Sequence, residues 1–349
     1  MNCAAIDLFC GIGGLTKGLS LSGIDVLAGI DIDNTCSFAY EKNNNGKFIN
    51  CDITTLEGPQ LMDIYPMNST KILVGCAPCQ PFSKYSDRYR KDGQNDEKWK
   101  LLYSFSRLIK EIKPEIVSME NVPGLVSQAV FKDFVFELKN LSYFVSWKVV
   151  FCPEYGVPQN RKRLVLLASR LGEIKLIPPF YGEENYLTVR DAIGNLPAIK
   201  DGEQYSKDVL HCACKLSAIN LKRIRQSVPG GTWRDWDDKL KLKCHKKDSG
   251  KTYGSVYGRM RWDEPSPTIT TQFYGYGNGR FGHPEQDRAL SLREGAILQS
   301  FPNDYVFVDN EHQFKLRDIG IHIGNAVPVE LGRAIGLSIK EHLKEFDKD

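Results

Sequence analysis

Several features that mark other classes of protein are absent from this sequence of 349 residues. It has no apolar run of about 18 residues, the length that a membrane-spanning helix needs. Its first residues, Met1 to Asp7, reach an acidic side chain before an apolar region can develop, so we expect no secretory leader. The ten cysteines are scattered, as in proteins of a reducing compartment. These absences favour a cytoplasmic globular protein without a membrane anchor.

The sequence also lacks a strong net charge and a second Cys-x-x-C pair. Its 46 Lys and Arg against 43 Asp and Glu give +3, so composition alone does not indicate a nucleic-acid partner. Cys76 and Cys79 form a single such pair, whereas a zinc site of this kind needs two. The pairs Cys212-x-Cys214 and Cys244-His245 match no common zinc spacing. We therefore predict no metal, and a redox pair stays as the alternative for Cys76 and Cys79.

The most informative stretch is Gly75-Cys-Ala-Pro-Cys-Gln-Pro-Phe-Ser83. Its prolines prevent a regular helix or strand, so Cys79 should lie in a loop. The apolar run 72–74 just before it is typical of a short buried strand. Open α/β sheets place their chemistry at the carboxyl ends of strands, which makes Cys79 a candidate nucleophile.

The beginning of the chain predicts a strand, a glycine turn and a helix. An apolar stretch, 3–9, runs into Gly11-Ile-Gly-Gly14, where glycines let the backbone approach a ligand closely. A tight turn in an unrelated α/β protein is the alternative. The next strand ends in Asp31-Ile-Asp33, and we expect Asp31 to bind ribose hydroxyls and Asp33 mainly to cap a helix. A third strand end supplies Asp52.

Two further strand ends carry candidate catalytic groups. Glu120 follows the apolar run 116–119 and precedes a turn, so it should lie at the same edge of the sheet as Cys79. A solvated turn carboxylate is the alternative. Arg161 and Arg163 precede the apolar run 164–168, and their alternate spacing predicts that they point the same way. A structural salt bridge remains open for Arg161.

The strand and helix rhythm disappears after about Leu171. Between residues 200 and 262, Lys and Arg outnumber the acids and are interleaved with Trp233, Trp236, Tyr253 and Tyr257, a composition typical of nucleic-acid contact. A solvated charged face is the alternative. We predict a first domain at 1–171, a second domain at 172–317, and a segment at 318–349 that returns to the first domain; the resemblance described below makes the first the catalytic cofactor-binding domain and the second the target-recognition domain.

Six motifs in this order and spacing resemble those of the DNA (cytosine-5) methyltransferases, of the bacterial type found in restriction-modification systems. Besides the Pro-Cys-Gln loop around Cys79, they are Asp7-Leu-Phe-Cys-Gly-Ile-Gly-Gly14, Glu120-Asn-Val-Pro-Gly124, Gln159-Asn-Arg-Lys-Arg163, Arg293-Glu294 with Leu298-Gln-Ser-Phe-Pro302, and Gly324-Asn-Ala-Val-Pro328.

The resemblance implies an α/β fold, with a Rossmann-like S-adenosylmethionine-dependent methyltransferase domain and a smaller, irregular target-recognition domain. It implies methyl transfer to carbon 5 of a flipped-out cytosine in a specific duplex, through a covalent Cys79 adduct at carbon 6. The alternatives are a transfer-RNA-type cytosine-5 methyltransferase and a non-catalytic DNA-binding relative. The chain has no Cys-Phe-Thr tripeptide and carries Ser83 where the RNA-directed subfamily has threonine, which disfavours the first.

The resemblance also assigns roles to individual residues. The catalytic residues would be Cys79, Glu120, Arg163 and Arg161. The residues that bind S-adenosylmethionine would be Phe9, Gly11, Gly13, Gly14, Asp31, Ile32, Asp52, Ile53, Pro78, Leu101, Asn325 and Val327. Contacts with double-stranded DNA would come from Ser83, Arg234, Tyr257 and Arg259. We expect a monomer, with a cognate restriction endonuclease as a separately acting partner.

Overall fold

The computed structural model describes residues 2–78, 99–250, 252–309 and 314–347, which form two compact units. The first unit contains Met1–Tyr155, Lys162–Phe180 and Val327–Asp349, and the second contains Gly156–Arg161 and Tyr181–Ala326. These limits differ from the predicted boundaries after residues 171 and 317. Ile174 is buried, and its carbonyl accepts a hydrogen bond from Ser146 of the first unit, which keeps residues 172–180 there. The predicted boundary after residue 317 falls inside the helix α9, Leu316–Asn325, and the whole of this helix belongs to the second unit.

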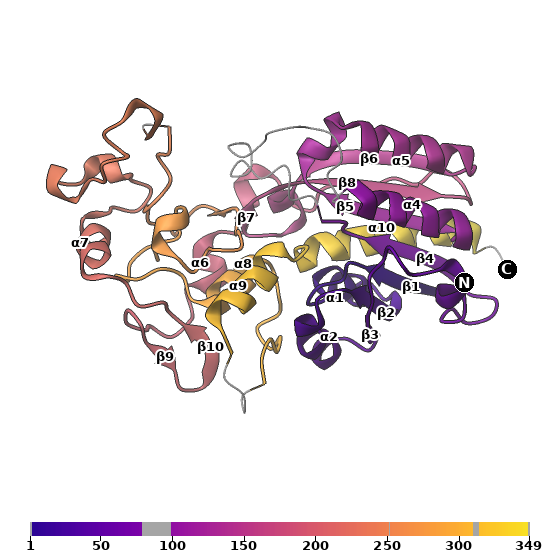
Figure 1. Ribbon diagram of the computed structural model, residues 1–349, viewed down its shortest axis with the longest axis horizontal. Helices are drawn as coiled ribbons and strands as arrows, with labels where there is room; N and C mark the ends of the chain where they lie inside the picture. Colours follow the sequence, from indigo (N-terminus) through magenta and orange to yellow (C-terminus); the bar gives the residue numbers. More distant parts are fainter. Residues whose placement is uncertain (1, 79–98, 251, 310–313, 348–349) are drawn as a thin grey trace. The chain divides into compact units, whose positions relative to one another are not determined.

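A seven-stranded sheet in the order β3-β2-β1-β4-β5-β8-β6 forms the centre of the first unit (Figure 1). The strands from β3 to β5 are parallel, and β8 and β6 are antiparallel to their neighbours. Their bounds are β1 Cys3–Leu8, β2 Asp25–Asp31, β3 Lys47–Asn50, β4 Thr70–Gly75, β5 Ile116–Asn121, β6 Phe144–Phe151 and β8 Lys162–Ser169. Every residue of β1 and β5 is buried, as expected of central strands covered on both faces. The predicted α/β fold is therefore confirmed.

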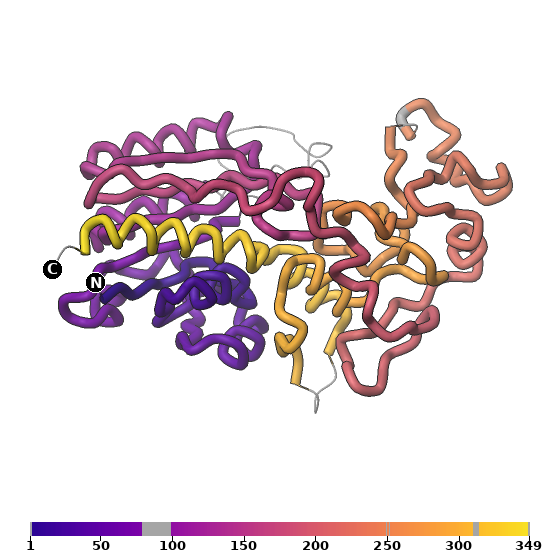
Figure 2. The backbone as a smooth tube through the Cα atoms, turned by 180° about the vertical axis from the view of Figure 1, so that it is seen from behind, coloured from indigo at the N-terminus to yellow at the C-terminus, as the bar shows by residue number. Residues whose placement is uncertain are grey.

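Helices cover both faces of this sheet. They are α1 Gly14–Leu21, α2 Ser37–Asn43, α3 Gly58–Met62, α4 Trp99–Ile112, α5 Ala129–Asn140 and α10 Val329–Phe346, with short 3₁₀ turns η1 Asn34–Cys36, η4 Pro123–Ser127 and η5 Cys152–Tyr155. Helices α3, α4 and α5 share one hydrophobic cluster with alternate residues of the strands. Helices α1 and α10 pack together although they lie near opposite ends of the chain (Figure 2). Within the described ranges, the helices are all too short or too polar to span a membrane.

The strand register brings the carboxyl ends of five strands into one line across the sheet. Ile49, Ile30, Leu8, Gly75 and Met119 are successive register partners on β3, β2, β1, β4 and β5. The residue after each of these positions therefore lies at the carboxyl edge, where parallel sheets place their ligands.

The second unit consists of short elements joined by long connections. They are α6 Val189–Ile193, α7 Ala218–Gln226, α8 Leu292–Leu298 and α9, the strand pairs β7 Gln159–Asn160 with β11 Ser266–Pro267 and β9 Gln204–Tyr205 with β10 Asp208–Cys212, and the 3₁₀ turns η6 Glu183–Asn185, η7 Trp233–Asp235, η8 Asp238–Leu240, η9 Asp248–Gly250 and η10 Tyr276–Asn278.

Two kinds of interaction stabilise this irregular unit. Trp233 and Trp236 are buried in a hydrophobic cluster with Ile224. The fully buried Arg288 donates two hydrogen bonds to Glu294, which also caps α8. Burial opposes ionisation of Glu294, but the Arg288 guanidinium offsets this effect and holds the pKa of that carboxyl below its usual value.

Candidate active site

The carboxyl edge of the sheet collects most of the residues predicted to act in the first unit. Phe9, Asp31, Cys76 and Glu120 each come directly after the line of register partners on their own strands. These four residues are far apart in the sequence, and the parallel register of the strands brings them to one edge. This placement agrees with the expectation drawn from strand ends.

Glu120 is the most enclosed of these residues, with 3% of its surface exposed. Cys76 donates a hydrogen bond from Sγ to Oε2 of Glu120, over 2.9 Å. Arg163 Nε lies 2.9 Å from the other oxygen, Oε1, as an ion pair. That oxygen nevertheless accepts no hydrogen bond from the described residues. A buried carboxylate oxygen with spare acceptor capacity is costly unless a ligand uses it.

The two predicted arginines occupy different environments. Arg163 lies near the start of β8, at the edge of the sheet that also carries Glu120. Arg161 precedes the strand and belongs to the second unit, where it is buried and donates to the carbonyl of Ile269 and to the side chain of Gln159. The two side chains are therefore not the matched pair that their spacing predicted, because β8 begins only at Lys162.

The loop after β4 is held from both sides. The Cys76 amide donates to the carbonyl of Leu8, and the buried side-chain amide of Asn121 donates to the carbonyl of Ala77 over 3.0 Å. Pro78 is exposed at the end of this described segment. Cys79 and Ser83 lie outside the described residues, so the contacts predicted for them are not described.

The glycine turn after β1 has the backbone that a ligand-approaching loop requires. Gly11 and Gly13 have φ of 51° and 84°, and Phe9 also has a positive φ, 61°. Gly14 begins α1. Asp31 Oδ2 accepts a hydrogen bond from the Gly11 amide over 2.8 Å, which joins the turn to the end of β2.

Other cofactor candidates of the first unit follow the ends of β2 and β3 or lie at the start of α4. Ile32 follows Asp31 and has 68% of its surface exposed, although its side chain is apolar. Asp52 accepts a hydrogen bond from the Thr54 amide, and the neighbouring Ile53 is buried. Leu101 is half-buried in the first turns of α4.

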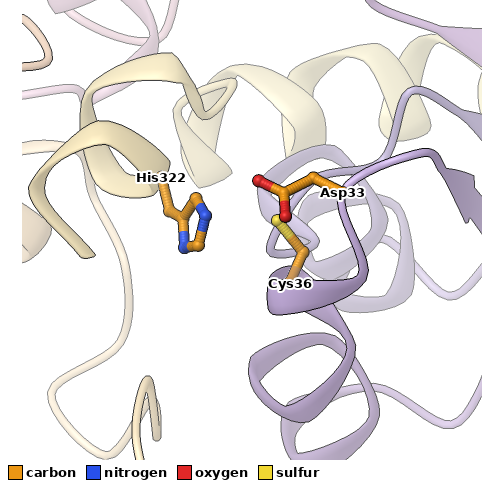
Figure 3. A group of neighbouring side chains, drawn as sticks. All are labelled: Asp33, Cys36 and His322. Atoms are coloured by element: carbon orange, nitrogen blue, oxygen red, sulfur yellow. The ribbon is translucent and has the colours of Figure 1, made fainter. Parts of the chain in front are cut away.

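Asp33 has the capping role that the sequence predicted. Its side chain accepts hydrogen bonds from the amide and hydroxyl of Thr35 at the start of η1. Figure 3 shows Asp33 just before this turn and Cys36 at its end, and it shows His322 on α9, which belongs to the second unit. Of the last two cofactor candidates, Asn325 is exposed at the end of α9, whereas Val327 is buried in the first unit.

The residues predicted to contact DNA differ in exposure. Arg234 is exposed, with its guanidinium 5.0 Å from the centre of the Trp233 ring. Tyr257 is half-buried and packs edge-on against Trp236 and Tyr276.

Arg259 is only 5% exposed and donates to backbone carbonyls of Ile224, Ser227, His283 and Gln286 and to the carboxylate of Asp287. All the guanidinium nitrogens of Arg259 are thereby used within the unit, so this residue has a structural role in place of the predicted DNA contact. The same correction holds for Trp233 and Trp236, which are core residues.

A family model described as C-5 cytosine-specific DNA methylase matches residues 3–341. The chain belongs to this family. The methylase is 56% identical over 344 residues to the Type II methylase M.HgiDII of Herpetosiphon aurantiacus, covering 98% of this chain and 96% of that protein. It is 33% identical over 359 residues to the Type II methyltransferase M.PspPI of Psychrobacter sp., covering 99% and 80%.

Solved structures show the same fold at low identity. A protein encoded within an Escherichia coli prophage aligns with a TM-score of 0.73 at 22% identity, covering 98% of the methylase and all of that chain. The Entamoeba histolytica methyltransferase EhMeth aligns with a TM-score of 0.67 at 17% identity, covering 98% and 99%. The predicted family, fold class and activity are confirmed, and the protein is a DNA cytosine-5 methyltransferase. Neither alternative, RNA methylation or a non-catalytic relative, is favoured.

The sequence did not predict the environments of two polar residues of the methylase, Cys76 and Asp7. Cys76 was weighed only as half of a redox or metal pair, yet its thiol contacts Glu120. Asp7 is the one acid in the apolar stretch 3–9, and the structure buries it with a hydrogen bond from Thr16. Burial raises the pKa of Asp7 to about 7, partly opposed by the Thr16 hydrogen bond. The signal for Asp7 was its position inside a buried strand, next to the glycine turn.

Proposed function

We propose that this methylase bonds Cys79 Sγ to carbon 6 of a cytosine flipped out of duplex DNA, with S-adenosylmethionine as the methyl donor. The observation that carries the proposal is Glu120, a buried carboxyl at the carboxyl end of β5 between Cys76 and Arg163. The loop that leads directly into Cys79 is fixed to the neighbouring Asn121. A nucleophile and an acid would thus be supplied by adjacent strands of one sheet.

The chemistry requires that carbon 5 of cytosine become electron-rich, because it is a poor nucleophile. Addition of the Cys79 thiolate to carbon 6 breaks the 5,6 double bond and places the electron pair on carbon 5. Carbon 5 then takes the methyl group. Loss of the proton from carbon 5 and expulsion of the thiolate restore the double bond. The target base must leave the stack for this reaction, at a cost of a few kcal/mol.

Glu120 and Arg163 suit the charge that this addition creates. The ring atoms N3 and O2 of cytosine are neighbours, as are Glu120 Oε1 and Arg163 Nε, 2.9 Å apart. A proton on Glu120 would be donated to N3, while the guanidinium would hold O2. Because Glu120 is buried, these interactions act where water screens them little.

The glycine-turn edge fits a nucleoside-containing cofactor. The Asp31 carboxylate accepts the backbone amides of Gly11 and Asp33, which fix it at this edge, and a carboxylate is a suitable acceptor for a ribose hydroxyl. The exposed side chain of Ile32 offers an apolar surface for an adenine ring. The positive φ at Phe9, Gly11 and Gly13 opens the backbone toward a ligand. When bound, S-adenosylmethionine supplies the electrophilic methyl group.

We assign sequence recognition to the second unit and expect the methylase to act in the cytoplasm as a monomer. Arg234 remains the candidate for DNA contact because it is exposed, whereas Arg259 is buried and no longer a candidate. The relatives named Type II methylases support a separately acting restriction endonuclease as its partner.

The test is a covalent trap at the natural target. Bisulfite sequencing of plasmid DNA treated with the methylase first identifies the modified cytosine. A duplex with 5-fluorocytosine at that position can accept the thiolate and the methyl group, but fluorine cannot leave as a cation. Wild-type protein with S-adenosylmethionine should give a denaturation-resistant complex whose modified peptide contains Cys79.

Two variants complete the experiment. Cys79→Ser should form no complex, because an alcohol is far less ionised than a thiol at neutral pH. Glu120→Gln should slow trapping about 100-fold or more, since an amide cannot donate the proton to N3. An adduct at Cys76, or trapping that survives Cys79→Ser, would overturn the mechanism.

A further inference from the structure

The contact between Cys76 and Glu120 is not explained by the fold alone. Cys76 is half-buried three residues before the predicted nucleophile, and its amide is tied to the carbonyl of Leu8 on β1. This backbone anchor directs the thiol from one strand end onto the carboxyl of another, 2.9 Å away. A small apolar residue would fill the same half-buried position without making that contact.

The thiol distinguishes the two oxygens of Glu120. Oε2 accepts the Cys76 S–H, so it is the oxygen engaged by the protein. Oε1 accepts no hydrogen bond from the described residues and lies beside Arg163. A proton carried by Glu120 while Cys76 donates to Oε2 therefore belongs on Oε1. This is the oxygen with capacity for a ligand.

We infer that Cys76 is a positioning residue that orients the Glu120 carboxyl, presenting Oε1 to ring N3 of the target cytosine. The inference rests on the function proposed above, because it assumes that Glu120 is the acid. A thiol suits the task since it is a weak donor. It fixes the orientation of the carboxyl through one hydrogen bond to Oε2 and leaves Oε1 for the ligand.

The primary test separates turnover from binding. Cys76→Ala should lower kcat about tenfold, the effect of losing one modest hydrogen bond in the transition state, with both KM values within about twofold of wild type. Cys76→Ser keeps a donor and should recover most of the lost rate. The matched control is Cys3→Ser, which removes a thiol of the same unit at the amino end of β1 and should leave kcat unchanged.

A double-mutant cycle tests whether Cys76 acts through Glu120. The trapping rate of the 5-fluorocytosine duplex is measured for wild type, Cys76→Ala, Glu120→Gln and the double variant. If the thiol only orients the carboxyl, Cys76→Ala should lose its effect in the Glu120→Gln background. Thermal unfolding of all four proteins shows whether any variant has lost stability.

The outcomes separate this inference from the proposed function. Failure of wild type to form an adduct through Cys79 refutes the proposed function. If the wild type is trapped normally, and Glu120→Gln slows trapping but Cys76→Ala does not, the positioning role alone is refuted. Equal, additive losses in the two backgrounds, or a Ser variant no better than Ala in kcat, would also overturn it.

Discussion

Asp31 and Asp33 show how two acids of one short segment take different roles. Asp31 accepts the amides of Gly11 and Asp33, and so joins the glycine turn to the end of β2. Asp33 instead caps the turn η1 through Thr35. The difference follows from the strand register, because only Asp31 directly follows the line of paired residues.

Replacing Asp31 by Ala should weaken binding of S-adenosylmethionine by about 1.5 to 3 kcal/mol, through loss of a charge-assisted hydrogen bond. Isothermal calorimetry on the folded variant measures this. Asp33→Ala is the matched control, and it should lower the free energy of unfolding by about 1 kcal/mol without changing affinity. Unchanged affinity in folded Asp31→Ala would refute the ribose assignment.

Asp7 predicts a dependence of stability on pH. Its pKa is raised to about 7 because burial disfavours the charged form. A raised carboxyl pKa adds stability at pH values below the unfolded pKa, and this contribution is lost as pH rises through about 7. Asn carries no titrating proton. Wild type should therefore lose a few kcal/mol relative to Asp7→Asn between about pH 4 and pH 7.

Denaturant unfolding of both proteins across this pH range measures the effect. Asp25→Asn, at an exposed position that begins β2, controls for the loss of one surface carboxylate. Parallel pH profiles for wild type and Asp7→Asn would show that Asp7 does not titrate in this window.

At the scale of elements, the packing of α1 against α10 depends on glycines. A Cβ atom on Gly18 would lie 2.4 Å from the Val329 carbonyl oxygen, and one on Gly336 would meet the side chain of Ser22. Gly332 lies against Leu15 and Gly18 of α1. The two helices therefore approach each other with backbone in contact, which few other residues would permit.

Gly18→Ala should destabilise the protein by about 1 to 3 kcal/mol, although alanine favours an isolated helix by about 1 kcal/mol over glycine. The reason is that the obstructing atoms belong to the backbone of α10 and cannot rotate away. Urea unfolding measures the change. Ser20→Ala, exposed on the same helix, should be neutral or slightly stabilising. Stabilisation by Gly18→Ala would show that the helices separate easily.

At the scale of the whole molecule, the two units have different construction. The first is a sheet covered by helices, and its candidate catalytic groups lie at strand ends. The second has short elements around a cluster of Trp233 and Trp236 and the buried pair Arg288 and Glu294. An irregular unit of this kind has few strands to align functional groups, so we expect the DNA contacts proposed for it to come from exposed loops.

If Arg234 contacts a phosphate, Arg234→Ala should reduce the slope of log affinity against log salt by about 0.9, because one fewer counterion is released. Fluorescence anisotropy with a target duplex at several salt concentrations measures the slope. Lys139→Ala, exposed at the end of α5 in the first unit, should leave it unchanged.

Arg259→Ala should behave differently. It should lower the unfolding temperature, because several buried carbonyls lose their donor.

An unchanged slope and an unchanged sequence preference in Arg234→Ala would show that Arg234 does not contact DNA.

The sequence by itself determined the family, the fold class and the strand ends that carry the motifs. Apolar runs bounded by Gly, Pro and Asp specify buried strands and the turns that follow them, and such patterns are local. The Asp33 cap and the placement of Glu120 at the edge of the sheet could be predicted for this reason.

Only the tertiary structure decided which polar and aromatic residues are buried and what they contact. Arg259 and Trp233 are of the residue types expected in DNA contacts, yet partners distant in sequence enclose them. Arg161 differs from Arg163 because β8 begins between them. The Cys76 thiol reaches Glu120 across 44 positions of sequence. Burial and hydrogen bonding depend on contacts between remote segments, which a local pattern does not encode.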